Sequence, residues 1–130
     1  MSKYNANAGT ELLFLLRQQR YLYHQLKGLS ERQQELVGTN SPELFLEVVT
    51  GRRKLVEKLR QVNNKLRPVK MNWPRVVSQI GPEHQKQAHK MVGEVREIIG
   101  EIRAITPPET AEGLGLKWEF AEPLVETQLQ

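Results

Sequence analysis

The fold is decided by residues 10–37, TELLFLLRQQRYLYHQLKGLSERQQELV, in which apolar side chains return every three or four residues. An α-helix turns once in about 3.6 residues, so this spacing places them on one helical face. The stripe comprises Leu12, Leu15, Gln19, Leu22, Leu26, Leu29, Gln33 and Leu36, flanked by Leu16, Tyr23 and Val37. Thr10 is the expected N-cap and Gly38 the expected stop. We therefore predict an amphipathic helix over residues 10–37.

A second stripe follows after a short break. Ser41, Pro42 and Glu43 are typical of a helix start, as N-cap, first-turn proline and acid near the positive helix end. The stripe is Phe45, Val48, Arg52, Leu55, Leu59, Val62 and Leu66. Pro68 disfavours helical geometry at the residue before it, so this helix is predicted over residues 42–66. The short break predicts an antiparallel hairpin.

A third stripe lies in residues 82–105. It consists of Ala88, Met91, Val95, Ile98, Ile102 and Ile105, widened by Val92 and Ile99. Gly93 and Gly100, one heptad apart, predict a close contact with another helix. Trp73 and Pro74 open a possible short helix that caps the end of the bundle. We predict an all-α fold, an antiparallel three-helix bundle with long helices at about 10–37, 42–66 and 82–105.

The two ends of the chain differ from this helical domain, residues 10–105. Residues 1–9 are expected to be disordered. Residues 106–130 hold one Lys and five Glu, a net charge of −4, whereas residues 1–105 have a net charge of +8. Leu114, Leu116, Trp118 and Phe120 alternate with small or charged residues, which is strand periodicity. Since an isolated strand is not stable, we expect an extended, flexible, acidic tail that covers its own bundle, pairs with another copy, binds a partner or forms a lid over a partner groove.

Composition excludes several classes of protein. The chain has 130 residues and no cysteine, which suits one domain and excludes disulfides and thiolate chemistry. The longest fully apolar run, Leu12 to Leu16, is far shorter than the ~20 residues that a membrane-spanning helix needs. The polar N-terminus shows no secretory signal. We therefore expect a cytoplasmic protein without a membrane span.

No catalytic, cofactor or metal motif is recognised. His84 and His89 are five residues apart and diverge on a helix, so all three histidines, His24 included, are expected to be exposed. Arg52, Gln19 and Gln33 on the apolar stripes faintly resemble the buried polar groups of helical chorismate mutases. The favoured interpretation is that they fix the helix register or extend from the edge of the seam to water. An enzyme of that type is the second hypothesis.

Nine basic residues and one acid, Glu57, lie between Arg52 and Arg75. Phosphate binding needs only Lys and Arg on one face. The run lacks interleaved aromatic residues other than Trp73, and no nucleic-acid motif is present. We interpret it as a solvated helix face, with a nucleic-acid-binding helical module as the third hypothesis.

Three stretches carry a resemblance to a known family. They are the leucine-rich LLFLLRQQRYLY of residues 12–23 with the Gln33-Gln34 pair, PELF of residues 42–45, and RRKLVEKL of residues 52–59. Over residues 10–105 the chain resembles the FlgN family of flagellar export chaperones. The resemblance implies a non-enzymatic cytoplasmic chaperone, without cofactor, that binds the C-terminal helices of hook-associated proteins of the hook–filament junction and delivers them to the type III export apparatus.

A partner helix is expected to lay its apolar face against surplus apolar surface. The candidate partner-binding residues are Val92, Ile99, Leu114, Leu116, Trp118 and Phe120. For Val92 and Ile99 an ordinary core position is the favoured alternative. The sequence leaves open whether the chain associates with itself through the tail or the bundle.

Overall fold

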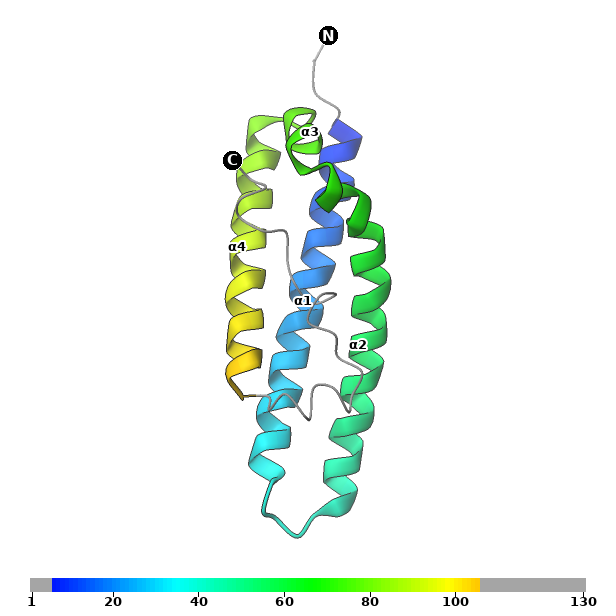
Figure 1. Cartoon of the computed structure of the whole chain (residues 1–130), viewed down its shortest axis with the longest axis vertical. Helices are drawn as coiled ribbons and strands as arrows, with labels where there is room; N and C mark the ends of the chain where they lie inside the picture. The colour runs from blue at the N-terminus through cyan, green and yellow to red at the C-terminus, as the bar shows by residue number, and fades with distance from the viewer. Residues whose placement is uncertain (1–5, 106–130) are drawn as a thin grey trace.

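A computed structural model describes residues 6–105 of the chain, which are almost entirely helical (Figure 1). The four helices of this part are α1 (Ala6–Leu36), α2 (Pro42–Met71), α3 (Trp73–Ser78) and α4 (Pro82–Ile105). Within residues 6–105 there is no strand, so the all-α prediction is confirmed for them. The predicted acidic tail, with its strand-like segment, lies outside the described residues.

The three long helices lie side by side, and α1 is the central one. It packs against both α2 and α4, whereas α2 and α4 make little direct contact with each other. After the turn at residues 37–41 the chain returns along α2, crosses the end of the body in α3, and runs back in the direction of α1 (Figure 1). Two sides of α1 are therefore covered by different helices.

The helix register shows that α4 ends before the α1–α2 hairpin does. Arg20 pairs with Glu94 and Lys27 with Glu101, and each pair joins residues 74 apart. The last residue of α4, Ile105, is therefore level with residue 31 of α1. We call the part of the hairpin that extends beyond this level, residues 32–51, the hairpin tip.

Most buried apolar side chains form one cluster that runs along the body. Its members from the long helices are Leu12, Leu13, Leu16, Leu22, Tyr23, Leu26, Leu55, Leu59, Val62, Leu66, Ala88, Met91, Val92, Val95, Ile98, Ile99 and Ile102. Trp73 and Ile80, at the start of α3 and just after it, are 0% exposed and close one end of the cluster. The predicted capping by Trp73 is thus confirmed.

The start and end of α1 have different local causes. Gly38 has a φ of 83°, a left-handed conformation that glycine adopts without a steric penalty, and α1 ends just before it. The predicted stop is thus confirmed. At the other end α1 begins at Ala6, so Thr10 lies inside the helix and is not its N-cap. Residues 6–9, which we expected to be disordered, belong to α1.

Pro68 does not end α2, contrary to the prediction. The helix continues to Met71. A proline in a helix removes one backbone hydrogen bond because it has no N–H. Here the Pro68 carbonyl accepts hydrogen bonds from the backbone N–H of Asn72 at 3.2 Å and from its side-chain Nδ2 at 3.0 Å. These bonds support the final turn beyond the proline.

The glycines of α4 do not mark a helix contact. Gly93 and Gly100 are exposed, and a Cβ at either would meet no atom within 4 Å. The predicted close approach at these positions is therefore wrong. Instead, α1 and α4 approach each other closely at the buried Gly9 of α1. A Cβ at this position would overlap with the imidazole ring of His84 at the start of α4.

Candidate functional site

Tyr23 marks the place where the three long helices meet. Its side chain is 1% exposed, and its hydroxyl accepts a hydrogen bond of 3.4 Å from Asn63 Nδ2 of α2. Asn63 Oδ1 accepts a second bond of 2.8 Å from Gln19 Nε2 of α1. Burial raises the pKa of Tyr23 well above its ordinary value, while the Asn63 hydrogen bond and the charge of Arg103 on α4 oppose that shift. Arg103 is therefore on the Tyr23 side of α4.

Two rows of residues flank Tyr23. Helical spacing places the members of each row on one side of their helix. The row on α2 is Arg52, Val56, Asn63 and Arg67, and the row on α4 is Val92, Arg96, Ile99 and Arg103. We call these two rows, with Tyr23 between them, the α2/α4 face. Its apolar residues are buried or half-buried, whereas Arg67, Arg96 and Arg103 are exposed along its edges.

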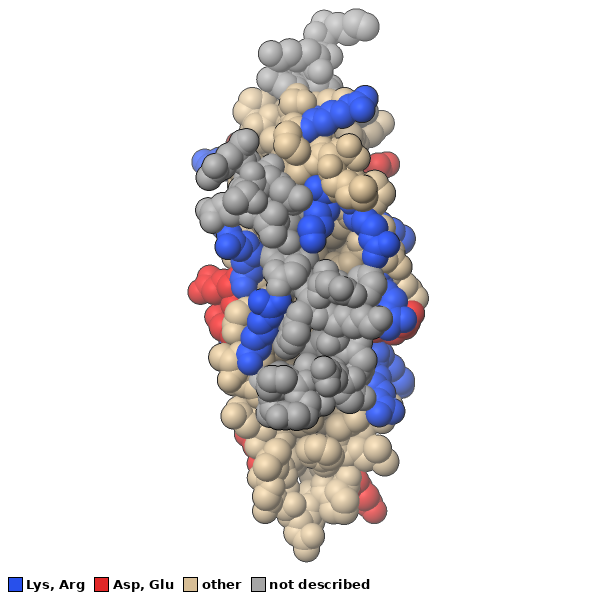
Figure 2. Space-filling view, in the orientation of Figure 1, with Lys and Arg blue, Asp and Glu red and all other residues tan. Residues whose placement is uncertain are grey.

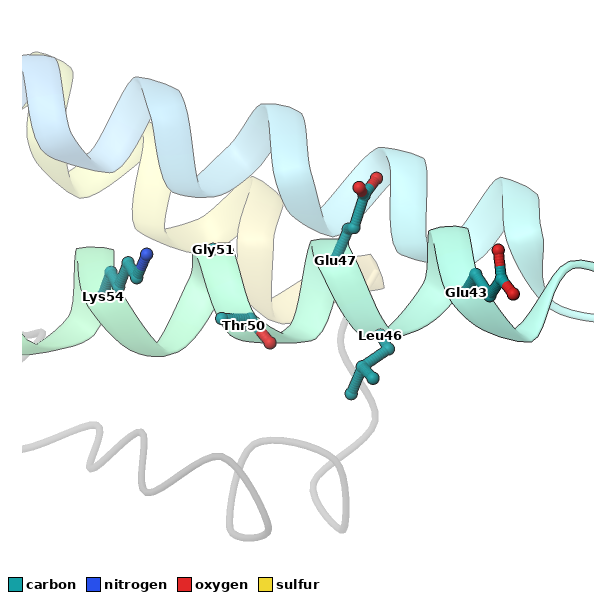
Figure 3. A pocket seen from close by; sticks show the side chains of 6 residues that line it. All are labelled: Glu43, Leu46, Glu47, Thr50, Gly51 and Lys54. Atoms are coloured by element: carbon teal, nitrogen blue, oxygen red, sulfur yellow. The ribbon is translucent and has the colours of Figure 1, made fainter.

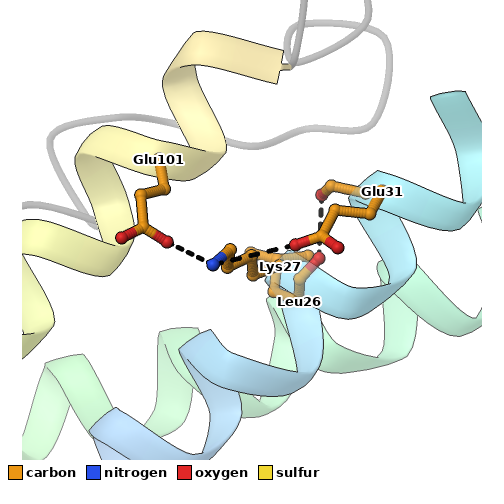
Figure 4. Close-up of polar contacts among 5 residues, drawn as sticks. Leu26, Lys27, Glu31 and Glu101 are labelled. Carbon is orange, nitrogen blue, oxygen red and sulfur yellow. Dashed lines mark hydrogen bonds and ion pairs between the residues drawn. The ribbon is translucent and has the colours of Figure 1, made fainter.

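Charge is divided between the two flanks of α4. Glu94 and Glu101 face α1, where Glu94 pairs with Arg20 at 3.0 Å and Glu101 with Lys27. Figure 4 shows Lys27 lying between Glu101 and Glu31, and the hydrogen bond to Glu101 raises the pKa of Lys27. These pairs are partly exposed and contribute little to stability. Arg96 and Arg103 lie on the opposite flank of α4 and are exposed.

The surface view agrees with this division. Figure 2 shows Lys and Arg side chains over both α4 and α2 along the middle of the body, with carboxylates mainly at the margins. A bound segment that matches such a surface carries acids, because opposite potentials speed and orient association.

The structure places two of the six predicted partner-binding residues. Val92 and Ile99 lie on the α2/α4 side of α4, 1% and 2% exposed, within the core cluster. Their side chains are thus mainly core residues beneath this face and expose almost no surface to a partner. Leu114, Leu116, Trp118 and Phe120 lie outside the described residues.

Arg52 is the most unusual side chain of the α2/α4 face. It is 1% exposed, and its Nη1 donates a hydrogen bond of 2.6 Å to Gln33 Oε1 of α1. Its Nε and Nη2 donors have no hydrogen-bond partner. Burial lowers the pKa of Arg52. The side chain does not extend to water, contrary to one of the two interpretations of the sequence.

The buried polar residues do not converge on one pocket. Gln19 bonds to Asn63 and Gln33 bonds to Arg52. The two glutamines are 14 residues apart, which is about 21 Å along α1. A small dicarboxylate held by all of them, as the chorismate mutase hypothesis requires, does not fit this arrangement.

The histidines are less exposed than predicted. His24 is exposed, but His84 and His89 are half-buried, and the His89 ring lies 6.2 Å from that of Trp73. Among residues 6–105 no cluster of three or more His, Cys, Asp or Glu is arranged to hold a metal ion. Nor does this part of the chain contain a helix with the length and hydropathy of a membrane span.

A hollow of about 480 Å³ lies on the outer side of α2, at the hairpin tip. The described residues that line it all come from α2, and Leu46 points away from α1 (Figure 3). The lining residues are Glu43, Leu46, Glu47, Thr50, Gly51 and Lys54. Because its described lining comes from a single helix, it is a weaker candidate site than the α2/α4 face.

Comparisons with protein-family models, with curated proteins and with solved structures found no match to this chain.

The sequence did not predict that Tyr23, Asn63, Arg96 and Arg103 belong to one surface. A sequence signal for the α4 residues exists: Arg96 and Arg103 are seven apart, and so are Glu94 and Glu101. That pattern predicts one basic and one acidic flank.

Proposed function

We propose that this chain is a non-enzymatic cytoplasmic chaperone that holds an amphipathic helix of a partner protein against the α2/α4 face of an antiparallel three-helix bundle. The observation that carries the proposal is the packing: α2 and α4 both pack on α1 but make little contact with each other. A helix laid along this side would contact both, as the fourth member of a helical bundle does.

The chemistry of the face specifies the partner helix. Val56 of the α2 row is half-buried, and Val92 and Ile99 of the α4 row are buried. Exposed Arg67, Arg96 and Arg103 line the edges. Residues 1–105 carry a net charge of +8, so the partner of this proposal is a helix with an apolar stripe and with acidic residues beside it.

The resemblance to FlgN-type chaperones supplies the identity of that partner. On this basis the bound segments are the C-terminal helices of hook-associated proteins of the hook–filament junction. Their exposed apolar stripes are prone to aggregation in the free state, and a chaperone covers them until they are delivered to the type III export apparatus.

The test is the affinity for a synthetic peptide of such a C-terminal helix, measured by fluorescence anisotropy. Val56→Glu places a charge among apolar contacts of the face, and we expect it to weaken binding about tenfold or more. Leu46→Glu is the matched control, because it makes the same kind of change on the outer side of α2, where Leu46 is 65% exposed. Its affinity should equal that of the unchanged chain.

Circular dichroism and thermal unfolding should first show that both variants are folded. Equal affinities for the two variants, or no binding at micromolar peptide, would contradict the proposed function.

A further inference from the structure

The unpaired donors of Arg52 lie on one edge of its guanidinium group. Gln33 Oε1 accepts from Nη1, which leaves Nε and Nη2 without partners. These two nitrogens present parallel N–H groups in a rigid plane. That is the geometry in which arginine binds both oxygens of a carboxylate.

The burial of Arg52 makes the missing partner significant. The side chain is 1% exposed, so water does not replace the absent hydrogen bonds. The guanidinium keeps its proton even when burial lowers its pKa, and a buried charge is strongly unfavourable without an opposite charge. Ion pairs among the described residues include those of Arg20, Lys27 and Arg60, and none of these pairs engages Arg52.

We propose that Arg52, oriented by Gln33, is a receptor for a carboxylate that binds Nε and Nη2 side-on. Arg52 is the first residue of the α2 row and lies at the base of the hairpin tip, just beyond the level where α4 ends. A segment that lies along the α2/α4 face and extends past the end of α4 therefore presents its acids to the receptor. A single buried polar contact of this kind fixes the register of a bound segment, as buried polar residues do in coiled coils.

Two segments carry suitable carboxylates. One is the chain's own residues 106–130, with five Glu and a net charge of −4 against +8 for residues 1–105. They follow Ile105, which is level with residue 31 of α1, near Gln33; four extended residues from Ile105 to Glu109 reach about 13 Å. The other is an acidic residue of the partner helix, and that source rests on the proposed function.

The first arm of the test uses the full chain with Glu109, Glu112, Glu119, Glu122 and Glu126 all changed to Gln. Its folding equilibrium constant is measured by denaturant titration, in about 0.5 M salt to screen exposed charges. If the chain's own carboxylate is bound, these changes lower the constant about tenfold or more when Arg52 is present, and much less in an Arg52→Met background. Arg60→Met, an exposed arginine of α2, is the matched control and should keep the full effect.

The second arm measures peptide affinity in the same backgrounds, with each acid of the partner peptide changed to Gln in turn. If the partner supplies the carboxylate, one change weakens binding about tenfold with Arg52 and has little effect with Arg52→Met. Arg52→Lys keeps the charge but lacks the side-on pair of donors. In the arm that shows a dependence on Arg52, it should therefore reduce the effect of the Glu→Gln changes as Arg52→Met does. It also replaces that variant if Arg52→Met does not fold.

If the Glu→Gln changes of the first arm depend on Arg52, residues 106–130 supply the carboxylate. If an acid-to-Gln change in the peptide depends on Arg52, the partner supplies it. Additive effects in both arms would overturn the proposal. A peptide that does not bind at all contradicts the proposed function, while the first arm alone then decides whether Arg52 holds a carboxylate.

Discussion

The two ends of the body bury apolar side chains to very different extents. At the α3 end, Trp73 and Ile80 are 0% exposed, because α3 and the ends of all three long helices surround them. Among the described residues, only those of α1, α2 and the turn between them form the hairpin tip, and Val37 and Leu46 are 69% and 65% exposed. The tip still buries Val48, which is 5% exposed on the stripe of α2, but among the described residues it lacks a cap of the kind that Trp73 and Ile80 provide at the other end.

The comparison also explains where polar groups enter the interior. The Arg52–Gln33 pair lies at the base of the hairpin tip, where α4 has ended and no third helix of residues 6–105 supplies apolar contacts. The capped end has the greater density of buried apolar contacts, so it should hold most of the stability, while the tip should open locally at lower cost.

The largest expected effect is the loss of the buried indole at the capped end. Trp73→Ala should lower the free energy of unfolding by about 3–5 kcal/mol, because it leaves a cavity in the closed core. Leu46→Ala at the tip should change it by no more than about 0.5 kcal/mol, since Leu46 is mostly exposed. Urea unfolding compares the two. Similar losses would show that the ends do not differ in the way described.

A smaller effect is expected at the base of the tip. Gln33→Leu removes the acceptor of Arg52 Nη1 and leaves another buried donor unpaired, which should cost about 1–3 kcal/mol. Adding Arg52→Met to this variant should restore much of the loss, because the unpaired charge is removed. The same urea titration measures both. If the double variant is no more stable than Gln33→Leu alone, the pair is not a unit.

Midway between the two ends, Tyr23 should make stability sensitive to alkaline pH. Burial raises its pKa in the folded chain, so its share of stability is complete below the unfolded pKa of about 10 and is lost as the pH rises toward the folded pKa. By pH 11 the loss should reach about 1.4 kcal/mol.

Tyr23→Phe should remove this part of the pH dependence between pH 9 and pH 11. Tyr21→Phe is the control, because Tyr21 is 62% exposed. Identical pH profiles for the two variants would exclude the burial effect.

The smallest effect concerns glycines in the middle and at the end of α4. Gly93→Ala and Gly100→Ala should each stabilise the chain by about 0.5–1 kcal/mol, because alanine favours the helix and its Cβ meets nothing. Gly9→Ala, at the capped end, should instead destabilise it, since the new Cβ would overlap with His84. Thermal unfolding would show opposite shifts, and shifts of one sign would refute the packing assigned to Gly9.

The long helices and the short one at Trp73 were predicted from the spacing of apolar residues, because that spacing is visible within each segment and needs no knowledge of its neighbours. The ends of α1 and α2 were predicted less well. Pro68 lies near a helix end, where bonds from Asn72 support the last turn. The contacts of Gly9 and His89 depend on another helix and were not predictable from their own segments.

The candidate site was predicted only in part for the same reason. Val92 and Ile99 were identified as flanking apolar residues of α4, but a single stripe does not show which neighbour each flank meets. Asn63 of α2 and Arg103 of α4 come from different helices, and each joins the site only through the packing of its helix on α1. The tail residues of the prediction stay a prediction.

The central claim is that an amphipathic helix binds the α2/α4 face, and methyl-resolved NMR during titration with the peptide tests it most directly. We expect shifts concentrated on the methyl groups of Val56, Val92 and Ile99, with those of Leu44 and Leu46 unchanged. Shifts confined to Leu44, Leu46 and Val37 at the hairpin tip would contradict the claim and place the binding surface there.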